Sequence, residues 1–147
     1  MKTKLLILCI CCILLFGSGC GTKSADYVDG TYTGKSAVFQ TDDGTEDGNG
    51  YGEIVIKIEG NQITECEFLT YEPDDKLKDS EYGKKNGEIA NRDFYNKAQK
   101  SVAACGEYSK MIVENNGIEG VDSISGATIN YNLLTDAAHA AFEKAEK

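Results

Sequence analysis

The feature that most constrains the fold of this sequence is a strand–turn–strand pattern over residues 51–71. Residues 51–59 alternate between apolar and polar side chains, with isoleucine at every second position from 54 to 58. Gly60 and Asn61 follow, a pair favoured in two-residue hairpin turns, and residues 62–71 form a second strand-like run. This pattern is typical of an antiparallel sheet with one buried and one solvated face.

The patterns on either side of this hairpin indicate a further strand and the start of the helical part. A strand is expected over residues 31–40, and the charged, glycine-containing residues 74–88 are expected to form a loop. Asn91 is predicted to cap a helix, because apolar residues recur at helical spacing from Phe94 onward, and Gly106 is predicted to end this helix.

Two further helical patterns complete the chain. A short helix is expected around residues 108–112, and a last helix is expected from about Asn132, with an alanine-rich apolar stripe. Because the strands precede the helices and do not alternate with them, the predicted fold class is α+β. We expect a small antiparallel sheet packed with two or three helices, in a single domain of a chain of 147 residues.

The N-terminal residues have the composition of a secretion signal. Lys2 and Lys4 precede an unbroken apolar run over residues 5–16, and small residues then lead to Cys20. The run is shorter than the roughly 20 residues that a membrane-spanning helix needs. The predicted division of the chain is a signal peptide at 1–19, a lipidated tether at 20–28 and a folded domain at 29–147.

Cys20 is the predicted site of lipid attachment. Gly-Ser-Gly-Cys at residues 17–20 resembles a lipobox, in which cleavage falls before the cysteine and the thiol receives a diacylglycerol. Buried acyl carbons contribute about 0.8 kcal/mol per CH₂, so this modification would anchor the protein firmly. The alternative is an ordinary signal peptide, cut nearby, that releases a fully soluble product.

Only two cysteines, Cys66 and Cys105, lie in the predicted domain, because the other four lie in the first twenty residues. Two cysteines cannot form a disulfide-dense framework or a four-cysteine metal site. We interpret them as small, buried, reduced side chains. A single disulfide outside the cytoplasm is the alternative.

The charge of the chain excludes nucleic acid as an expected partner. Removal of residues 1–19 takes away two of the 15 basic residues and none of the 24 acidic ones, so the net charge falls from −9 to about −11. A surface of this charge repels nucleic acid and anionic lipid headgroups.

No metal site and no separate catalytic constellation is predicted. The acidic, glycine-rich residues 41–50 do not match a calcium-binding loop in register, because Ile54 stands where the closing glutamate would be required. We interpret this segment as a solvated connection between strands. His139, the single histidine, has no nucleophile near it in sequence and is expected to be a surface or boundary residue.

The segment DSISGAT, residues 122–128, carries the chemistry that we expect of this chain. Its small residues form a turn that places the Thr128 hydroxyl at the start of a helix. Free backbone N–H groups and the positive end of the helix dipole make such a position suited to a phosphate. The local alternative is that Thr128 caps the helix and that Gly126 shapes the turn.

The same segment resembles the Asp-x-x-Ser/Thr-Gly-Ala-Thr signature of the FMN-binding domain found in the C subunit of the sodium-translocating quinone reductase, the G subunit of Rnf complexes and many bacterial lipoproteins. The likeness extends to residues 29–34, to the hairpin at 51–63 and to the alanine-rich end. It implies covalent FMN, as a phosphoester to Thr128 that an FAD:protein FMN transferase makes with magnesium. Asp122, Ser125, Gly126 and Ala127 would complete the sequence that the transferase reads.

The resemblance also implies a function. The expected protein is an extracytoplasmic flavoprotein, lipid-anchored to the cell membrane, that shuttles electrons between membrane redox proteins and external acceptors. It is expected to be an electron carrier more than a stand-alone enzyme, because the cofactor supplies the chemistry. The alternatives are a non-redox surface lipoprotein that binds flavin or another ligand, and a flavin-dependent reductase with its own small substrate.

Overall fold

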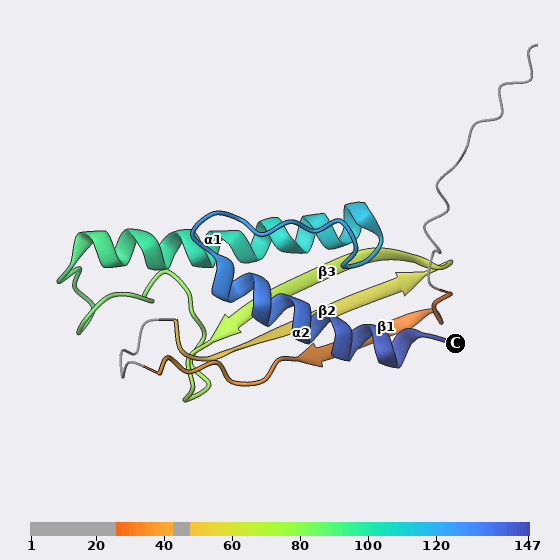
Figure 1. The fold of residues 1–147 in the computed structure, drawn as a ribbon, viewed down its shortest axis with the longest axis horizontal. Coiled ribbons are helices and arrows are strands. Elements are labelled where there is room, and N and C mark those ends of the chain that lie inside the picture. The colour runs from red at the N-terminus through yellow and green to blue at the C-terminus, as the bar shows by residue number, and fades with distance from the viewer. Residues whose placement is uncertain (1–25, 43–47) are drawn as a thin grey trace, which may run out of the picture.

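Three strands and two helices make up the part of the chain that the computed structural model describes, residues 26–42 and 48–147 (Figure 1). They are β1 (Gly30–Lys35), β2 (Tyr51–Glu59), β3 (Gln62–Tyr71), α1 (Arg92–Asn115) and α2 (Thr128–Ala145). The strands form one antiparallel sheet in the order β1-β2-β3. The predicted α+β class, with a small antiparallel sheet and two helices in a single domain, is confirmed.

The hairpin of β2 and β3 has the predicted bounds and turn. Gly60 and Asn61 both have positive φ, at 60° and 63°, as the two central residues of a type I′ turn require. The isoleucines of β2 are fully buried, whereas Val55 between them is 38% exposed. One face of the sheet therefore carries the core, and the helices cover that face.

β1 is shorter than the predicted strand over residues 31–40. Ser36 ends it, because its hydroxyl accepts the Gly52 N–H at 2.9 Å, a donor that a continuing strand would pair with a backbone carbonyl. Among the described residues that follow, Phe39 forms an isolated antiparallel bridge with Gly50.

The alanine-rich stripe of α2 lies directly on β1 and β2. Five buried alanines and leucines of this helix have no exposed surface: Leu134, Ala137, Ala138, Ala141 and Ala145. The backbones approach so closely that a Cβ on Gly34 would lie 1.9 Å from the Ala137 carbonyl oxygen. Small residues on both elements are thus a requirement of this packing.

α1 is one long helix, so the prediction that Gly106 ends a helix and a second short one follows is wrong. Asn91 does cap it, and its side chain accepts the Phe94 N–H at 3.0 Å. A glycine inside a helix costs about 1 kcal/mol, and burial of Tyr108 on the same helix offsets that cost. The helix ends instead at Asn115, and the C-cap residue Asn116 has a left-handed conformation with φ 52°.

α2 begins at Thr128, four residues before the predicted start near Asn132. The DSISGAT segment and the last helix are therefore continuous, which places Thr128 in the first helical turn.

Cys66 and Cys105 are free thiols, in agreement with the interpretation that both are reduced, although Cys66 is only half-buried. His139 is exposed, as predicted.

The signal peptide at 1–19, the tether up to residue 25 and the lipidation site Cys20 lie outside the described residues, as do residues 43–47 of the acidic segment. Within the described part of the chain, no helix is long and apolar enough to cross a membrane. The same part holds no group of three or more metal-ligating side chains placed to bind an ion.

Candidate functional site

The turn that leads into α2 is held by the hydroxyl of Tyr108, a side chain of α1 with no exposed surface. This hydroxyl accepts the Ile124 N–H at 2.9 Å and donates to the Ala127 carbonyl at 3.3 Å. The Ala127 N–H closes the turn on the Ile124 carbonyl at 2.9 Å. One buried phenol thus positions both sides of the Ser-Gly-Ala part of the motif.

Gly126 is required in this turn by its backbone conformation. Its φ is +85°, a value that side chains other than glycine rarely adopt. A Cβ built on Gly126 would meet no atom within 4 Å, so lack of space does not explain the glycine. Ala127, by contrast, is 4% exposed and packs into the core, so that a small apolar residue is needed there.

Thr128 does not cap α2, so the local alternative for this residue is not what the structure shows. The N-cap position is Ala127, and no side chain caps the helix. Thr128 is exposed, and its hydroxyl makes no hydrogen bond with the described residues. The N–H groups of Thr128, Ile129 and Asn130 likewise have no acceptor in the described part of the chain, as is usual at an uncapped helix start.

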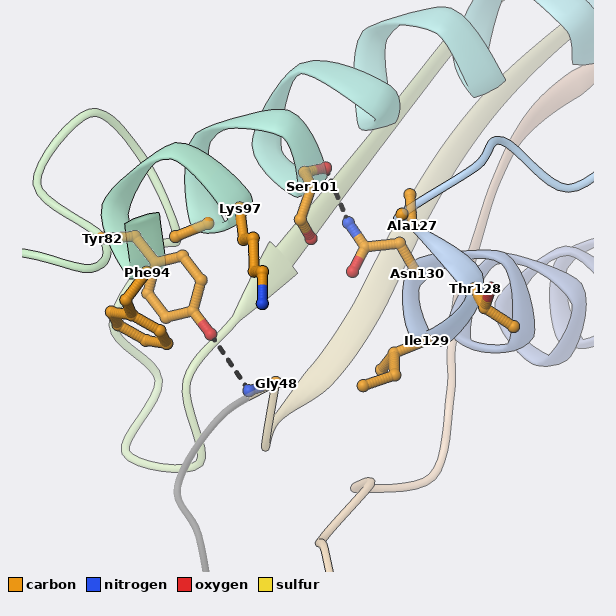
Figure 2. A pocket seen from close by; sticks show the side chains of 11 residues that line it. Gly48, Tyr82, Phe94, Lys97, Ser101, Ala127, Thr128, Ile129 and Asn130 are labelled. Atoms are coloured by element: carbon orange, nitrogen blue, oxygen red, sulfur yellow. Dashed lines mark hydrogen bonds between the residues drawn. The ribbon is translucent and has the colours of Figure 1, made fainter. Parts of the chain in front are cut away.

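A pocket of about 350 Å³ adjoins this helix start (Figure 2). This volume lies within the range of about 300–1,000 Å³ that is common for small-molecule sites. The start of α2 forms one wall, the first turns of α1 form another, and two loops complete it. Its lining is Gly48, Tyr82, Phe94, Lys97, Ala98, Ser101, Gly126, Ala127, Thr128, Ile129 and Asn130.

Asn130 presents an unpartnered acceptor to this pocket, although the residue is only 3% exposed. Its Nδ2 donates to the Ser101 carbonyl at 2.8 Å and contacts the Cys105 Sγ at 3.3 Å, which fixes the orientation of the amide. Its Oδ1 has no partner among the described residues and is directed into the pocket in Figure 2. A ligand that donates an N–H at this point would satisfy it.

Lys97 provides a positive charge at the same pocket. Its side chain extends from α1 with the ammonium directed between Tyr82 and Ile129 (Figure 2). It makes no ion pair and no hydrogen bond with the described residues. In Figure 2 the Thr128 side chain lies on the opposite side of the first turn of α2 from Asn130 and Ile129, at the rim of the pocket.

The structure brings part of the predicted site to the pocket. Gly126, Ala127 and Thr128 line it, whereas Asp122 and Ser125 lie on the preceding loop as exposed residues outside the lining. No N–H group of the described residues donates to the Asp122 carboxylate. The carboxylate therefore does not stabilise the turn through a hydrogen bond.

Sequence reasoning missed most of the lining, namely the residues outside the signature. Phe94, Ala98 and Ser101 share one face of α1 at helical spacing, and this periodicity was available in the sequence. That these residues line a pocket could not be predicted, because the same spacing is equally consistent with packing in the core. Gly48 and Tyr82 come from loops whose path depends on tertiary contacts.

Comparisons with known proteins identify one family and one similar fold. A family model described as the FMN-binding domain matches residues 47–143. The fold is similar to the crystal structure of the CPE2226 protein from Clostridium perfringens, with a TM-score of 0.55 and 21% identity over 83% of this chain and 94% of that one. A solution NMR structure from Clostridium thermocellum is 18% identical over 74% of this chain and 90% of that one, with a TM-score of 0.32. No curated protein matches the chain.

Proposed function

Because the chain belongs to the FMN-binding domain family and is thus a flavin-binding protein, we propose that it carries FMN covalently on Thr128 and shuttles electrons at the outer side of a membrane. The observation that carries the proposal is the exposed, unbonded Thr128 hydroxyl at the uncapped start of α2, beside a pocket. The proposed attachment is a phosphoester made by an FAD:protein FMN transferase. The alternatives remain a non-redox binding lipoprotein and a flavin-dependent reductase.

The residues at the helix start suit a phosphate esterified to Thr128. The free N–H groups of residues 128–130 point out of the helix start and would donate to phosphate oxygens. The positive end of the α2 dipole stabilises negative charge at the same place. Exposure of Thr128 also leaves its hydroxyl accessible to a modifying enzyme.

The pocket residues suit a flat, partly apolar ring system. Phe94 and Tyr82 provide aromatic surface, and Asn130 offers an acceptor for a ring N–H. Lys97 would compensate negative charge on the ligand. FMN, when bound, supplies transfer of one or two electrons, and the residues of the chain hold and orient it.

Electron shuttling is favoured over a separate enzyme activity because the lining of the described pocket contains no histidine, cysteine, aspartate or glutamate. To test it, membranes that contain the wild-type protein or Thr128→Val are supplied with a respiratory donor, and reduction of external ferricyanide is measured. Faster reduction with the wild type supports a carrier. Equal rates would favour the non-redox alternative, and substrate turnover by the purified protein would favour a reductase.

Membrane anchoring through Cys20 gives a separate prediction. If the thiol is acylated, the wild-type protein is expected to partition into the detergent phase, and Cys20→Ala is expected to stay in the aqueous phase. Phase separation in a clouding detergent followed by blotting measures both. Free release of the wild type into the medium would show that residues 1–19 are an ordinary signal peptide.

Asp122 is predicted to matter for loading more than for stability. Its carboxylate accepts no N–H from the described residues, so Asp122→Asn is expected to change the free energy of unfolding by less than about 0.5 kcal/mol. We propose that the transferase reads this residue, through its charge near the magnesium ion. Flavin incorporation by the variant is therefore expected to fall at least tenfold.

Two measurements on the same Asp122→Asn preparation separate these roles. Incorporation is followed by intact mass, and thermal melting is followed on protein made without the transferase. Normal loading would refute a recognition role. A large fall in melting temperature would instead favour a structural role in the turn.

A further inference from the structure

A cluster of buried polar residues extends from the pocket lining at Asn130 into the protein behind it. Thr70, Lys78 and Asn130 are three of the four buried polar or charged residues in the described part of the chain, at 2%, 5% and 3% exposed. The Cys105 thiol joins two of them, at 3.8 Å from the Thr70 Oγ1 and 3.3 Å from the Asn130 Nδ2. Lys78 is joined to Thr70 through the backbone, where the Lys78 N–H donates to the Thr70 carbonyl at 2.9 Å.

Lys78 is the unusual member of this cluster, because lysine is rarely buried without a partner of opposite charge. Within the described residues it forms no ion pair, whereas five less buried lysines do: Lys35, Lys57, Lys76, Lys84 and Lys147. Burial lowers the pKa of Lys78, which reports a cost of keeping this charge in the folded protein. The Glu72 carboxylate attracts this charge but does not form an ion pair with it. A buried charge without an ion pair next to a cleft is a candidate functional group.

The contacts of Lys78 place its charge directly behind the pocket wall. Its Nζ donates to the Gly48 carbonyl at 3.2 Å and lies 4.9 Å from the centre of the Tyr82 ring. Both residues line the pocket, at the opposite end from Thr128 in Figure 2. A flavin attached at Thr128 has its phosphate at the Thr128 end, so only the ring system can reach the Lys78 end.

We propose, resting on the proposed function, that Lys78 sets the redox potential of the flavin by stabilising the reduced ring. Two electrons and one proton convert the neutral oxidised ring into a reduced ring with one negative charge. A fixed cation behind the wall attracts the reduced form more than the oxidised form, and low-dielectric surroundings strengthen that attraction. Burial of the Lys78 charge thus destabilises the unloaded protein, and attraction to the reduced flavin offsets that cost.

The test compares Lys78→Met with wild type and with Lys100→Met, which removes an exposed lysine of α1 outside the pocket lining. The three proteins are produced with the transferase and equilibrated with a reducing dye that donates the two electrons. Lys78→Met is expected to lower the ratio of reduced to oxidised flavin at least tenfold, about 30 mV for a two-electron couple. Lys100→Met is expected to stay within twofold of wild type.

The possible results separate this inference from the proposed function. A wild-type protein without covalent flavin would overturn both. Loaded Lys78→Met with a ratio within twofold of wild type would overturn the role of Lys78 alone, as would reduced loading at an unchanged potential. Unloaded Lys78→Met is expected to melt at or above wild type, and a much lower melting temperature would overturn the proposal by making Lys78 a structural residue.

Discussion

Thr128→Val is expected to abolish covalent flavin while leaving the fold intact. Valine keeps the shape of threonine but has no hydroxyl to esterify, and the Thr128 hydroxyl makes no hydrogen bond that the fold would lose. Protein co-produced with the transferase should show no flavin fluorescence in a denaturing gel and no mass gain. Its free energy of unfolding should stay within about 0.5 kcal/mol of unloaded wild type.

Thr135→Val is a matched control for this substitution on the same helix. The Thr135 hydroxyl donates to the Tyr131 carbonyl at 2.9 Å and lies outside the pocket lining. We expect this variant to load normally. Covalent flavin on Thr128→Val at wild-type levels would place the attachment on another residue.

Tyr108→Phe is expected to have the largest effect on stability among the variants that leave the pocket lining unchanged. The substitution removes only the hydroxyl, which accepts the Ile124 N–H and donates to the Ala127 carbonyl. A buried donor without an acceptor costs about 1–3 kcal/mol, so the free energy of unfolding should fall by about 2 kcal/mol. Loading should slow as well, because the turn before Thr128 is less ordered.

Urea denaturation of unloaded protein measures this loss, with Tyr95→Phe as the control. The Tyr95 hydroxyl donates to the Ser80 carbonyl at 3.1 Å at an exposed position, so its removal should cost less than about 0.5 kcal/mol. Equal stability of the two variants would contradict the role assigned to Tyr108. If Tyr108→Phe is less stable but takes up flavin as fast as wild type, Tyr108 stabilises the fold without affecting flavin loading.

The parts of the fold that were predicted well depend on local patterns. The hairpin of residues 51–71 combines isoleucines at every second position with a turn pair whose backbone preference is strong, so its bounds follow from sequence. The end of α1 does not, because Gly106 has the local properties of a helix terminator. Only the burial of Tyr108 and Ile112 against the rest of the domain shows why the helix continues.

The candidate site shows the same division between local and long-range information. The turn at Gly126 and the position of Thr128 at a helix start are local and follow from the signature. The free acceptor of Asn130 and the buried charge of Lys78 could not be predicted from local sequence, because each depends on contacts between residues far apart in the chain. In the sequence, Asn130 lies between the signature and the helix expected from about Asn132, and Lys78 lies in the charged segment expected to form a loop.

The measurement that tests the central claim most directly is the intact mass of wild-type protein produced with and without the transferase. With the transferase, the protein should gain the mass of one FMN less one water, and peptide fragmentation should place this mass on Thr128. Without it, the mass should be that of the processed chain alone. An unmodified mass in the presence of an active transferase, or the modification on a residue other than Thr128, would contradict the account.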